Sequence, residues 1–528
     1  MRDTPKTDRE LAGWIELWQL GELDETSRLK LVARLESDAA ARQAFREAVR
    51  FEAMLHLEFP DNVVHIPRRR TAWHRRMAVP LMAVASLALC LGISLMRWNS
   101  RSTDVVVLQT PAGKHPVKSQ ASEIIAASPV ARVDSVSNLT LDPASMAMDS
   151  GALLMPGKIH IQSGEAQITF FSGAQVSLSG PCVFVLKSDF RAILMEGRLT
   201  AQVPQQAIGF TVHTPSGQLR DLGTSFAVNV EPDGVSDIHV LEGQVEAASR
   251  DGSAVVTLEG NQASRIAQNS LTPITFTGEG WPVKPSITRG VTLPDSIHWS
   301  FESFDGDQTN DETRKHPLWM RDRNGDAGAS HSRIRPGVSG KALSFDGISQ
   351  FAESSYRGIS GHKPRSVSLW VNIPPDAPYE YPNGILSWGS SEQSRKWQVC
   401  WNNGDQGTVG ALRVEFGDGH LVGTTDLRDG RWHHLCAVFL GIDDSDPASH
   451  VKLYVDGRLE TLSGRRSQLI RTDTESPQST AVTLGRWLGY WPGKEPFYFM
   501  GMVDEVRIFG EALSPAQVAS LARPLTQK

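Results

Sequence analysis

The sequence predicts a multidomain chain with a small all-α cytoplasmic head, one transmembrane helix and two all-β domains. Its 528 residues are enough for three or four domains of about 150 residues each. Residues 77–96 form an uncharged apolar run, and the hydrophobic period is helical before this run and strand-like after it. With 40% hydrophobic residues, 21% charged residues and a net charge of −6, the chain has an ordinary globular composition. It has no overall basic field, so we expect no direct binding to nucleic acid.

Residues 1–61 are predicted to form the small helical head. One apolar stripe recurs at helical spacing and comprises Leu11, Trp14, Ile15 and Trp18. A Gly-Glu-Leu turn at 21–23 follows, and then a helix ending in Leu-x-x-Asp at 35–38. This order resembles the cytosolic head of bacterial anti-sigma factors, which implies a sigma factor as partner. The head has no cysteine, so the resemblance implies the zinc-free form; a helical bundle with no sigma partner is the alternative.

Residues 77–96 read MAVPLMAVASLALCLGISLM and contain no charged side chain. A helix of this length spans roughly 30 Å, about the thickness of the hydrocarbon core of a bilayer. The run therefore predicts a single transmembrane helix. A buried core helix or a late signal peptide is the alternative, but a signal peptide usually lies within the first 15–30 residues or so.

The charges that flank the run predict its orientation. The stem at 62–76 carries five arginines and no acidic residue, whereas only Arg97 and Arg101 follow closely after the run. The positive-inside rule then places the N-terminus in the cytoplasm. We expect a single-pass protein of the bacterial inner (cell) membrane whose C-terminal domains lie in the periplasm.

Residues 97–150 are rich in Ser, Ala, Pro and Thr and are predicted to be a tether, with one early strand at 104–109. A two-residue period then predicts a β domain over 151–266, with Ile159, Ile161, Ile168 and Phe170 inward, and a linker over 267–294. A Glu-Gly corner recurs in three strand-like segments at 193–199, 239–245 and 256–261. Glycine allows the left-handed or bulged backbone that such a corner needs.

Four ordered pieces of this domain resemble the FecR domain: Leu194-Met-Glu-Gly-Arg-Leu199, Phe210-Thr-Val-His-Thr-Pro215, Asp221-Leu-Gly-Thr-Ser-Phe226 and Val240-Leu-Glu-Gly-Gln-Val245. The resemblance implies the periplasmic part of a transmembrane regulator that is paired with an extracytoplasmic-function sigma factor. The run at 221–226 has two interpretations. It is either an active-site loop or, as we prefer, a structural turn in which Asp221 ties the backbone, Gly223 supplies its conformation and Phe226 enters the core.

Residues 295–521 are predicted to form a β-sandwich, because they hold most of the 14 tryptophans together with frequent Gly and Asp turns. Strand alternation at 451–455 leads into an Asp456-Gly457 hairpin turn. A late strand is indicated by Val503, Val506 and Ile508. Ser514 and Pro515 predict the start of a short terminal helix.

Seven ordered pieces of this region resemble the LamG-like jelly roll of the concanavalin A-like superfamily. They are His298–Phe301, Gly340–Gly347, Arg365–Val371, Asp429–His434, Lys452–Gly457, Leu484–Arg486 and Gly501–Ile508. The resemblance implies binding of a glycan or an envelope protein, sometimes through Ca²⁺. An exposed aromatic ring can stack on a sugar, and the candidates are Trp388, Trp397, Trp401, Trp487, Tyr490 and Trp491. Packing in the core or at a sheet edge is the alternative for each.

No cofactor and no metal site is assigned from the sequence. Asp443, Asp444 and Asp446 form an acidic loop that is expected to be solvated, so Ca²⁺ stays unassigned. His433 and His434 belong to a strand motif that is structural in this superfamily. At most one disulfide is expected among Cys182, Cys400 and Cys436. Cys400 and Cys436 lie in strand-like runs and are expected to be buried thiols.

We expect no enzymatic activity, because the paired carboxylates of glycosidases and the common hydrolase and nucleotide-binding motifs are missing. The sequence instead predicts a single-pass membrane regulator that senses a ligand or partner outside the cytoplasm and signals to a sigma factor. The alternative is an envelope-anchored adhesin or structural protein that binds carbohydrate or protein and has no sigma partner.

Overall fold

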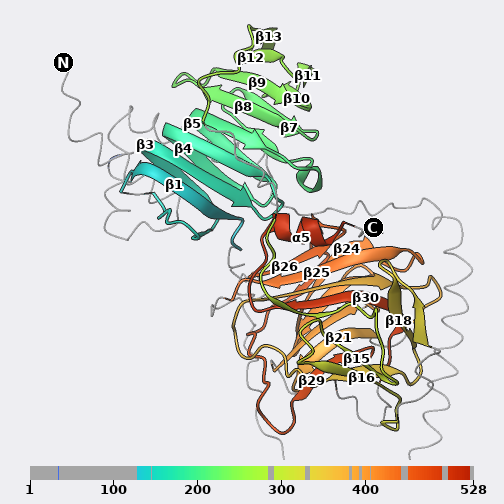
Figure 1. Ribbon diagram of the computed structural model, residues 1–528. Helices are drawn as coiled ribbons and strands as arrows, with labels where there is room; N and C mark the ends of the chain where they lie inside the picture. Colours follow the sequence, from blue (N-terminus) through green and yellow to red (C-terminus); the bar gives the residue numbers. More distant parts are fainter. Residues whose placement is uncertain are drawn as a thin grey trace, which may run out of the picture. The chain divides into compact units, whose positions relative to one another are not determined.

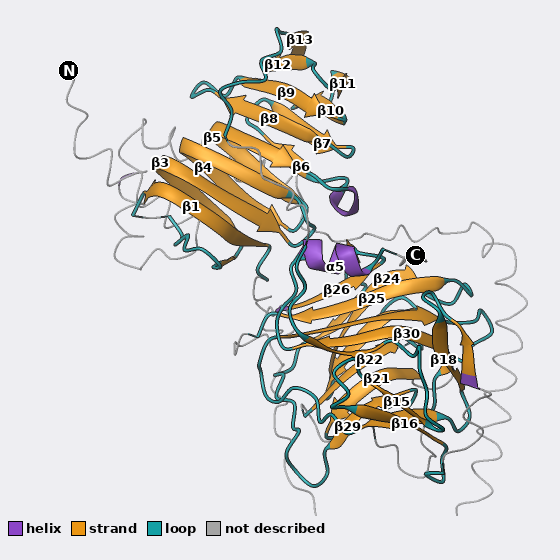
Figure 2. Cartoon of the chain, viewed as in Figure 1, coloured by secondary structure: helices purple, strands orange, loops and turns teal. Residues whose placement is uncertain are grey.

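The computed structural model describes Arg34 and residues 128–143, 145–282, 291–326, 333–379, 383–391, 395–404, 406–441, 450–489 and 497–523 (Figure 1). Two all-β parts account for nearly all of them, and strands and loops dominate the cartoon in Figure 2. We name them the first β domain, residues 128–282, and the C-terminal sandwich, residues 291–523. Each is described by itself.

The predicted fold class needs one correction. The described residues are mostly β-strand, and their one complete α-helix is α5 (Pro515–Leu521). None of the described helices has the length and apolar character needed to cross a bilayer. The described residues therefore show neither an all-α head nor a transmembrane helix. Almost all of their secondary structure lies after residue 130, where the two-residue hydrophobic period forms β-strands. Residues 77–96, the early strand at 104–109 and, apart from Arg34, the head lie outside the described residues. The expected localisation stays a prediction.

The first β domain is one sheet of 13 strands. Its elements are β1 (Ala131–Leu141), β2 (Leu153–Leu154), β3 (Gly157–Phe170), β4 (Gln175–Ser188), β5 (Arg191–Gln202), η1 (Gln205–Ala207), β6 (Thr211–His213), β7 (Gly217–Asp221), β8 (Ser225–Val230), β9 (Ser236–Glu242), β10 (Gln244–Ser249), β11 (Val255–Glu259), β12 (Ala263–Ala267) and β13 (Ser270–Pro273). Strand β1, which pairs with β3, lies within the residues predicted to form the tether, and β13 lies within the predicted linker. The sheet therefore begins earlier and ends later in the sequence than predicted.

The sheet divides at β5. The first residues of β5 pair in parallel with β6, and its last six pair antiparallel with β8. One leaf continues through β6, β7, β10 and β11, and the other through β8, β9, β12 and β13. Side chains of both leaves enter one hydrophobic core, which also contains Ile159, Ile161, Ile168 and Phe170, each fully buried. The predicted alternation of β3 is therefore confirmed.

Two of the three Glu-Gly corners have the predicted left-handed glycine. Gly197 has φ +98°, and Gly243 has φ +82°. A Cβ at Gly197 would lie 2.3 Å from the carbonyl oxygen of Pro181, so close strand packing also excludes a side chain there. The third corner differs, because its left-handed residue is Asn261 (φ +66°) rather than Gly260.

The turn after β7 is a structural turn, as preferred from the sequence. The fully buried Asp221 carboxylate accepts hydrogen bonds from the Gly223 amide at 2.8 Å and from the Thr224 hydroxyl. Gly223 has φ +104°, and Phe226 is fully buried in the core. Burial raises the pKa of Asp221 to about 7, although the hydrogen bonds from Gly223 and Thr224 oppose the shift.

This raised pKa predicts a pH-dependent contribution to stability. Because the folded pKa lies above the unfolded value of about 4, the contribution of Asp221 is complete below about pH 4 and is lost as pH rises through about 7. Asp221→Asn cannot ionise, so it does not lose this contribution as the pH rises. Its urea midpoint, relative to that of the wild type, should therefore be higher at pH 7.5 than at pH 4.5. Asp233→Asn, at an exposed turn, is the control and should show no such difference. A difference from the wild type that is equal at both pH values would contradict the assignment.

The C-terminal sandwich consists of two antiparallel sheets. One has eight strands, ordered β17-β18-β30-β20-β25-β26-β27 with β14 beside β30. They are β14 (Ser296–Trp299), β17 (Ile334–Pro336), β18 (Lys341–Asp346), β20 (Arg365–Asn372), β25 (Trp432–Phe439), β26 (Val451–Val455), β27 (Arg458–Leu459) and β30 (Met500–Phe509).

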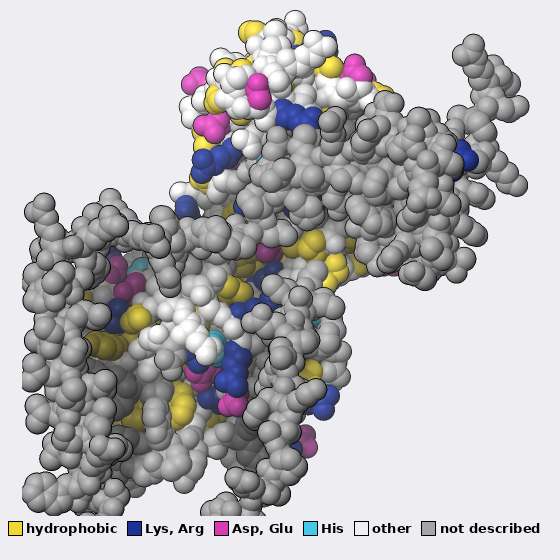
Figure 3. All heavy atoms as spheres, turned by 180° about the vertical axis from the view of Figure 1, so that it is seen from behind, with side chains coloured by type: hydrophobic (Ala, Val, Ile, Leu, Met, Phe, Trp, Pro, Cys, Tyr) yellow, Lys and Arg dark blue, Asp and Glu magenta, His cyan; other side chains and the backbone are white. Residues whose placement is uncertain are grey.

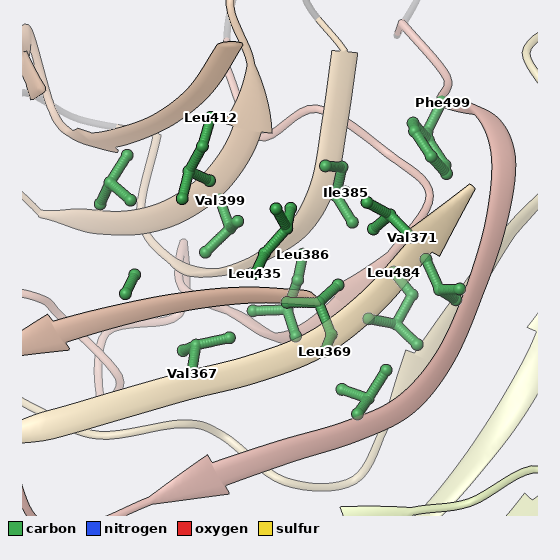
Figure 4. Close-up of a cluster of buried hydrophobic side chains, with 14 of the residues drawn as sticks. Val367, Leu369, Val371, Ile385, Leu386, Val399, Leu412, Leu435, Leu484 and Phe499 are labelled. Atoms are coloured by element: carbon green, nitrogen blue, oxygen red, sulfur yellow. The ribbon is translucent and has the colours of Figure 1, made fainter. Parts of the chain in front are cut away.

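The other sheet has nine strands in the order β15-β16-β19-β29-β21-β22-β23-β24-β28. They are β15 (Gln308–Asn310), β16 (Pro317–Arg321), β19 (Phe351–Ser354), β21 (Asn383–Gly389), β22 (Lys396–Trp401), β23 (Ala411–Phe416), β24 (Gly419–Asp426), β28 (Gly464–Arg466) and β29 (Thr480–Leu484). Figure 4 shows the two sheets meeting in one apolar cluster, with Leu369 and Leu435 from the eight-stranded sheet and Leu386 and Leu484 from the nine-stranded one.

Predicted local features of this sandwich are confirmed. The hairpin β26–β27 turns at Asp456 and Gly457, both with positive φ. Helix α5 has a capping box between Ser514 and Gln517, with Pro515 in its first turn. The uneven spacing of Val503 and Val506 reflects a β-bulge in β30, where Glu505 has φ +50° and the register to β20 shifts.

One charged side chain lies fully inside the sandwich. Arg365 is 0% exposed, and its guanidinium donates to the carbonyl oxygens of Lys363, Ile359 and Gly361 and to the Thr472 hydroxyl, at 3.1, 2.8, 2.6 and 2.9 Å. Its carbon Cζ lies 5.3 Å from the ring centroid of Trp397 and 5.5 Å from that of Phe439. Burial lowers the pKa of this guanidinium to about 9. Arg365 thus ties the 359–363 segment to the core through hydrogen bonds rather than through a buried ion pair.

Candidate functional site

The predicted aromatic candidates divide into three groups. Trp388, Trp397 and Trp401 are at most 1% exposed and belong to the core, so they present no ring face to solvent. Trp487 is half-buried and lies beside a pocket. Tyr490 and Trp491 lie outside the described residues. Of the described candidates, Trp487 is therefore the one at a surface that a ligand can reach.

The pocket lies on the outer face of the nine-stranded sheet. Strand alternation produces it: Trp397, Val399 and Trp401 of β22 point into the core, so Lys396 and Gln398 point outward. The same alternation turns Arg413 and Glu415 of β23 outward. The cavity has a volume of about 290 Å³ and is lined by Ser391, Lys396, Gln406, Arg413, Glu415, Gly417, Asp418, His420, Arg466, Trp487 and Gly489.

The wall of the pocket is organised around Glu415. Its Oε2 accepts hydrogen bonds from Lys396 Nζ at 2.8 Å and Gln398 Nε2 at 2.9 Å, and its Oε1 accepts one from Arg413 Nε at 2.8 Å. Burial alone would raise the pKa of Glu415, but the charges and hydrogen bonds of Lys396 and Arg413 outweigh it and lower the pKa to about 2. Glu415 is therefore ionised, and it fixes the orientation of both cations.

The 487–489 segment forms the rim of the pocket, and hydrogen bonds to Lys396 and Gln398 hold it in place. Lys396 Nζ donates to the Leu488 carbonyl at 2.9 Å, and the Leu488 amide donates to Gln398 Oε1 at 2.6 Å. Lys396 Nζ also lies 5.0 Å from the Trp487 ring centroid. The close approach depends on Gly384, since a Cβ there would lie 2.4 Å from Trp487 Cα.

Two buried polar atoms at the pocket have no partner among the described residues. His420 is 3% exposed, and its Nε2 makes no hydrogen bond. Burial and the nearby Arg413 lower the pKa of His420 to about 4, whereas a hydrogen bond to the Asp418 backbone favours the charged form. His420 is thus neutral near pH 7. The Trp487 indole nitrogen Nε1 is the other unpartnered atom.

No group of three or more potential metal ligands is found within the described ranges. The acidic loop with Asp443, Asp444 and Asp446 lies outside them. His433 contacts Asp456 at 2.8 Å and Asp429 at 3.2 Å, and this hydrogen-bonded setting raises its pKa. Cys400 and Cys436 are free, buried thiols, as expected, and Cys182 is a free, buried thiol as well. On the described surface that Figure 3 leaves visible, charges of both signs lie close together rather than in a field of one sign.

Comparison with protein families assigns both β parts. Residues 157–246 match the family model described as FecR protein, and residues 346–519 match that of the concanavalin A-like lectin/glucanases superfamily. The chain contains a FecR domain and a concanavalin A-like jelly roll. The first β domain is therefore called the FecR domain below, and the C-terminal sandwich the jelly roll. The comparison with curated proteins finds no match.

Similar solved structures include domain 4 of AbnA, a GH43 extracellular arabinanase from Geobacillus stearothermophilus, in complex with arabinotriose. It is 24% identical, and the match covers 43% of this chain and 97% of that chain with a TM-score of 0.31. A protein described as a proposed anti-sigma factor, from Parabacteroides distasonis, is 21% identical over 22% of this chain and 59% of its own, with a TM-score of 0.21. The CBM40 of the Ruminococcus gnavus IT-sialidase is 12% identical over 34% of this chain and 96% of its own, with a TM-score of 0.24. At these scores the likenesses carry no argument about ligands or partners.

Proposed function

We propose that this protein is a regulator that binds a carbohydrate ligand through its jelly roll and holds an extracytoplasmic-function sigma factor through residues 1–61, with the FecR domain between these two parts of the chain. The observation that carries the proposal is the joining of the two domain types in one chain, one matching the FecR family and the other the concanavalin A-like superfamily. The FecR resemblance supports the sigma-factor partner. The polar pocket of the jelly roll supports ligand binding.

The pocket supports binding rather than catalysis. Its central carboxylate, Glu415, accepts three hydrogen bonds and has a pKa of about 2, so it holds no proton to donate near neutral pH. Glycoside cleavage needs one carboxyl group that acts as an acid and a second that acts as a base or nucleophile. In the proposed role Glu415 instead orients neighbouring donors toward a bound ligand.

A ligand outside can regulate a partner only if it binds two states of the protein with different affinity. The same pocket would also serve an envelope-anchored binding protein that has no sigma partner. The two functions differ in whether the chain holds a sigma factor.

Co-purification separates them. The tagged full chain is co-expressed with each extracytoplasmic-function sigma factor of its source organism, and a chain lacking residues 1–61 serves as the matched comparison. We expect the full chain to retain one sigma factor and the shortened chain to retain none. If the full chain retains no sigma factor, the regulatory proposal fails and the envelope-anchored binding protein is left.

A further inference from the structure

Residues 274–282, the last described residues of the FecR domain, lie across its sheet without forming a strand of it, and we name them the strap. We infer that the strap is bound to the sheet while His239 is neutral and is released when His239 is protonated. Release adds the residues of the strap to those that connect the FecR domain with the jelly roll. The inference stands on contacts within the FecR domain, so it does not depend on the ligand or the sigma factor proposed above.

The strap crosses the outer face of the leaf that contains β8, β9 and β12. Cross-strand pairing aligns one residue from each of four neighbouring strands in a row on this face: Thr200, Ala227, His239 and Ala263. The row faces away from the core, because the residues on either side of Ala227 and His239 in their strands enter the core. At one end the Ile274 amide donates to the Ala263 carbonyl at 3.1 Å, and at the other the Thr200 hydroxyl donates to the Pro282 carbonyl at 3.0 Å. The strap therefore runs from β12 across β9 and β8 to β5.

His239 binds the middle of the strap. Its side chain stands between Ala227 and Ala263 in the row, and the residue is 4% exposed. Its Nδ1 accepts a hydrogen bond from the Thr277 amide at 3.2 Å, and its ring centroid lies 4.8 Å from that of Trp281. Residues 277–280 are exposed, so the middle of the strap is held by the His239 ring rather than by burial of its own side chains.

Protonation of His239 removes this hydrogen bond. The Thr277 amide needs the lone pair of Nδ1, so the neutral ring carries its proton on Nε2. Both ring nitrogens of an imidazolium carry a proton, so Nδ1 then meets the Thr277 amide as a second donor. The buried charge also loses its hydration, which further favours the released strap.

The charged groups around His239 do not reverse this preference. Asp237, two residues earlier in β9, favours the imidazolium, but its carboxylate is bound to Arg265 of β12 at 2.6 and 2.7 Å. Arg198 of β5 donates to a carbonyl of the strap at 3.4 Å, and Glu279 of the strap is exposed. Burial outweighs Asp237 and lowers the pKa of His239 from its ordinary value of 6.5. The bound strap is therefore most stable above about pH 6.5 and loses stability as the pH falls below that value.

The test is hydrogen–deuterium exchange of the full-length protein, measured by mass spectrometry on the peptide that covers the strap. Exchange is expressed as a protection factor, which removes the pH dependence of the chemical exchange itself. We expect the protection of the strap to fall at least about five-fold between pH 7.5 and pH 5, whereas that of β8 stays unchanged. His239→Gln keeps an acceptor but does not titrate, so its protection should no longer depend on pH. His160→Gln is the matched control and should keep the wild-type response, because the His160 side chain is 39% exposed on β3.

A second variant acts on the other side of the hydrogen bond. Thr277→Pro removes the amide that donates to Nδ1 and leaves His239 in place. Its strap should be poorly protected at both pH values. Protection of β8 in each variant shows that the domain has remained folded. Burial lowers the pKa of His213 to about 4, so that histidine stays neutral over the range of the experiment.

Three results would overturn the inference. The first is equal protection of the wild-type strap at both pH values. The second is a fall in protection for His239→Gln that matches the wild type, since another group would then be titrating. The third is a strap that is better protected at pH 5, because the attraction of a charged imidazole to the Trp281 ring would then outweigh the lost hydrogen bond.

Discussion

Replacing Arg365 with leucine is expected to lower the free energy of unfolding of the jelly roll by about 3–5 kcal/mol. The guanidinium is fully buried and makes four hydrogen bonds, to three carbonyl oxygens and the Thr472 hydroxyl. Leucine fills the apolar part of the space next to Trp397 and Phe439 but removes all four hydrogen bonds. The Lys363 carbonyl loses its donor, whereas the Ile359 and Gly361 carbonyls keep the Trp388 indole N–H and the Thr472 amide. Each lost hydrogen bond costs about 0.5–1.5 kcal/mol, and the acceptor that is left without any donor costs roughly 1–3 kcal/mol.

The measurement is urea unfolding of the full chain, followed by tryptophan fluorescence, since Trp388 and Trp397 are fully buried in the jelly roll. Arg365→Lys keeps the charge but has fewer donors, and it should fall between the wild type and the leucine variant. Arg431→Leu is the matched control, because the Arg431 side chain is 84% exposed and its nearest acidic contact is 3.9 Å away. Equal midpoints for Arg365→Leu and Arg431→Leu would show that the buried hydrogen bonds contribute little.

Replacing Glu415 with alanine is expected to cost about 3–4 kcal/mol and to abolish ligand binding at the pocket. Removal of the carboxylate leaves Lys396, whose side chain is 5% exposed, without its anionic partner, and it releases Gln398 and Arg413. Glu415→Gln keeps the shape and removes the charge, so it should cost less. A double variant, Lys396→Met with Glu415→Gln, should recover part of the loss, because no unpaired charge is left in the buried pair.

The same ion pairs predict the acid side of the stability curve. The folded pKa of Glu415, about 2, lies below the unfolded value of about 4.3. Its contribution is therefore present above about pH 4 and is lost as pH falls toward 2. Unfolding midpoints at pH 2.5 and pH 6 should differ less for Glu415→Gln than for the wild type. If both proteins lose stability equally, Glu415 is not the group that is protonated.

Local features of the fold could be predicted because neighbouring residues determine them. The Asp456-Gly457 turn needs only two residues with positive φ, and helix α5 needs only Ser514, Pro515 and Gln517 at its start. The core role of Trp397 and Trp401 was also open to prediction, since they alternate with outward positions and share one face with Val399. The number of tryptophans alone, without their alternation along the strand, does not distinguish core positions from surface positions.

The pocket could not be predicted in the same way. Lys396, Arg413 and His420 come from three strands, and each occupies an ordinary outward position. They become a site only because the 487–489 segment, about 90 residues later, is held over them through Leu488. Such contacts depend on tertiary packing, which strand periodicity does not encode. The break in β30 at Glu505 was visible only as an uneven spacing of apolar residues.

Because the FecR sheet divides at β5, an error in the register of this strand during folding would affect a large part of the domain. Side chains alternate between the two faces of a strand, so a slip of one residue turns every inward side chain outward. In β5 such a slip would disturb β4, β6 and β8 together, because all three pair with it. A β5 in the wrong register would therefore prevent correct pairing in both leaves at once, so correct assembly of the whole domain depends on the register of this strand.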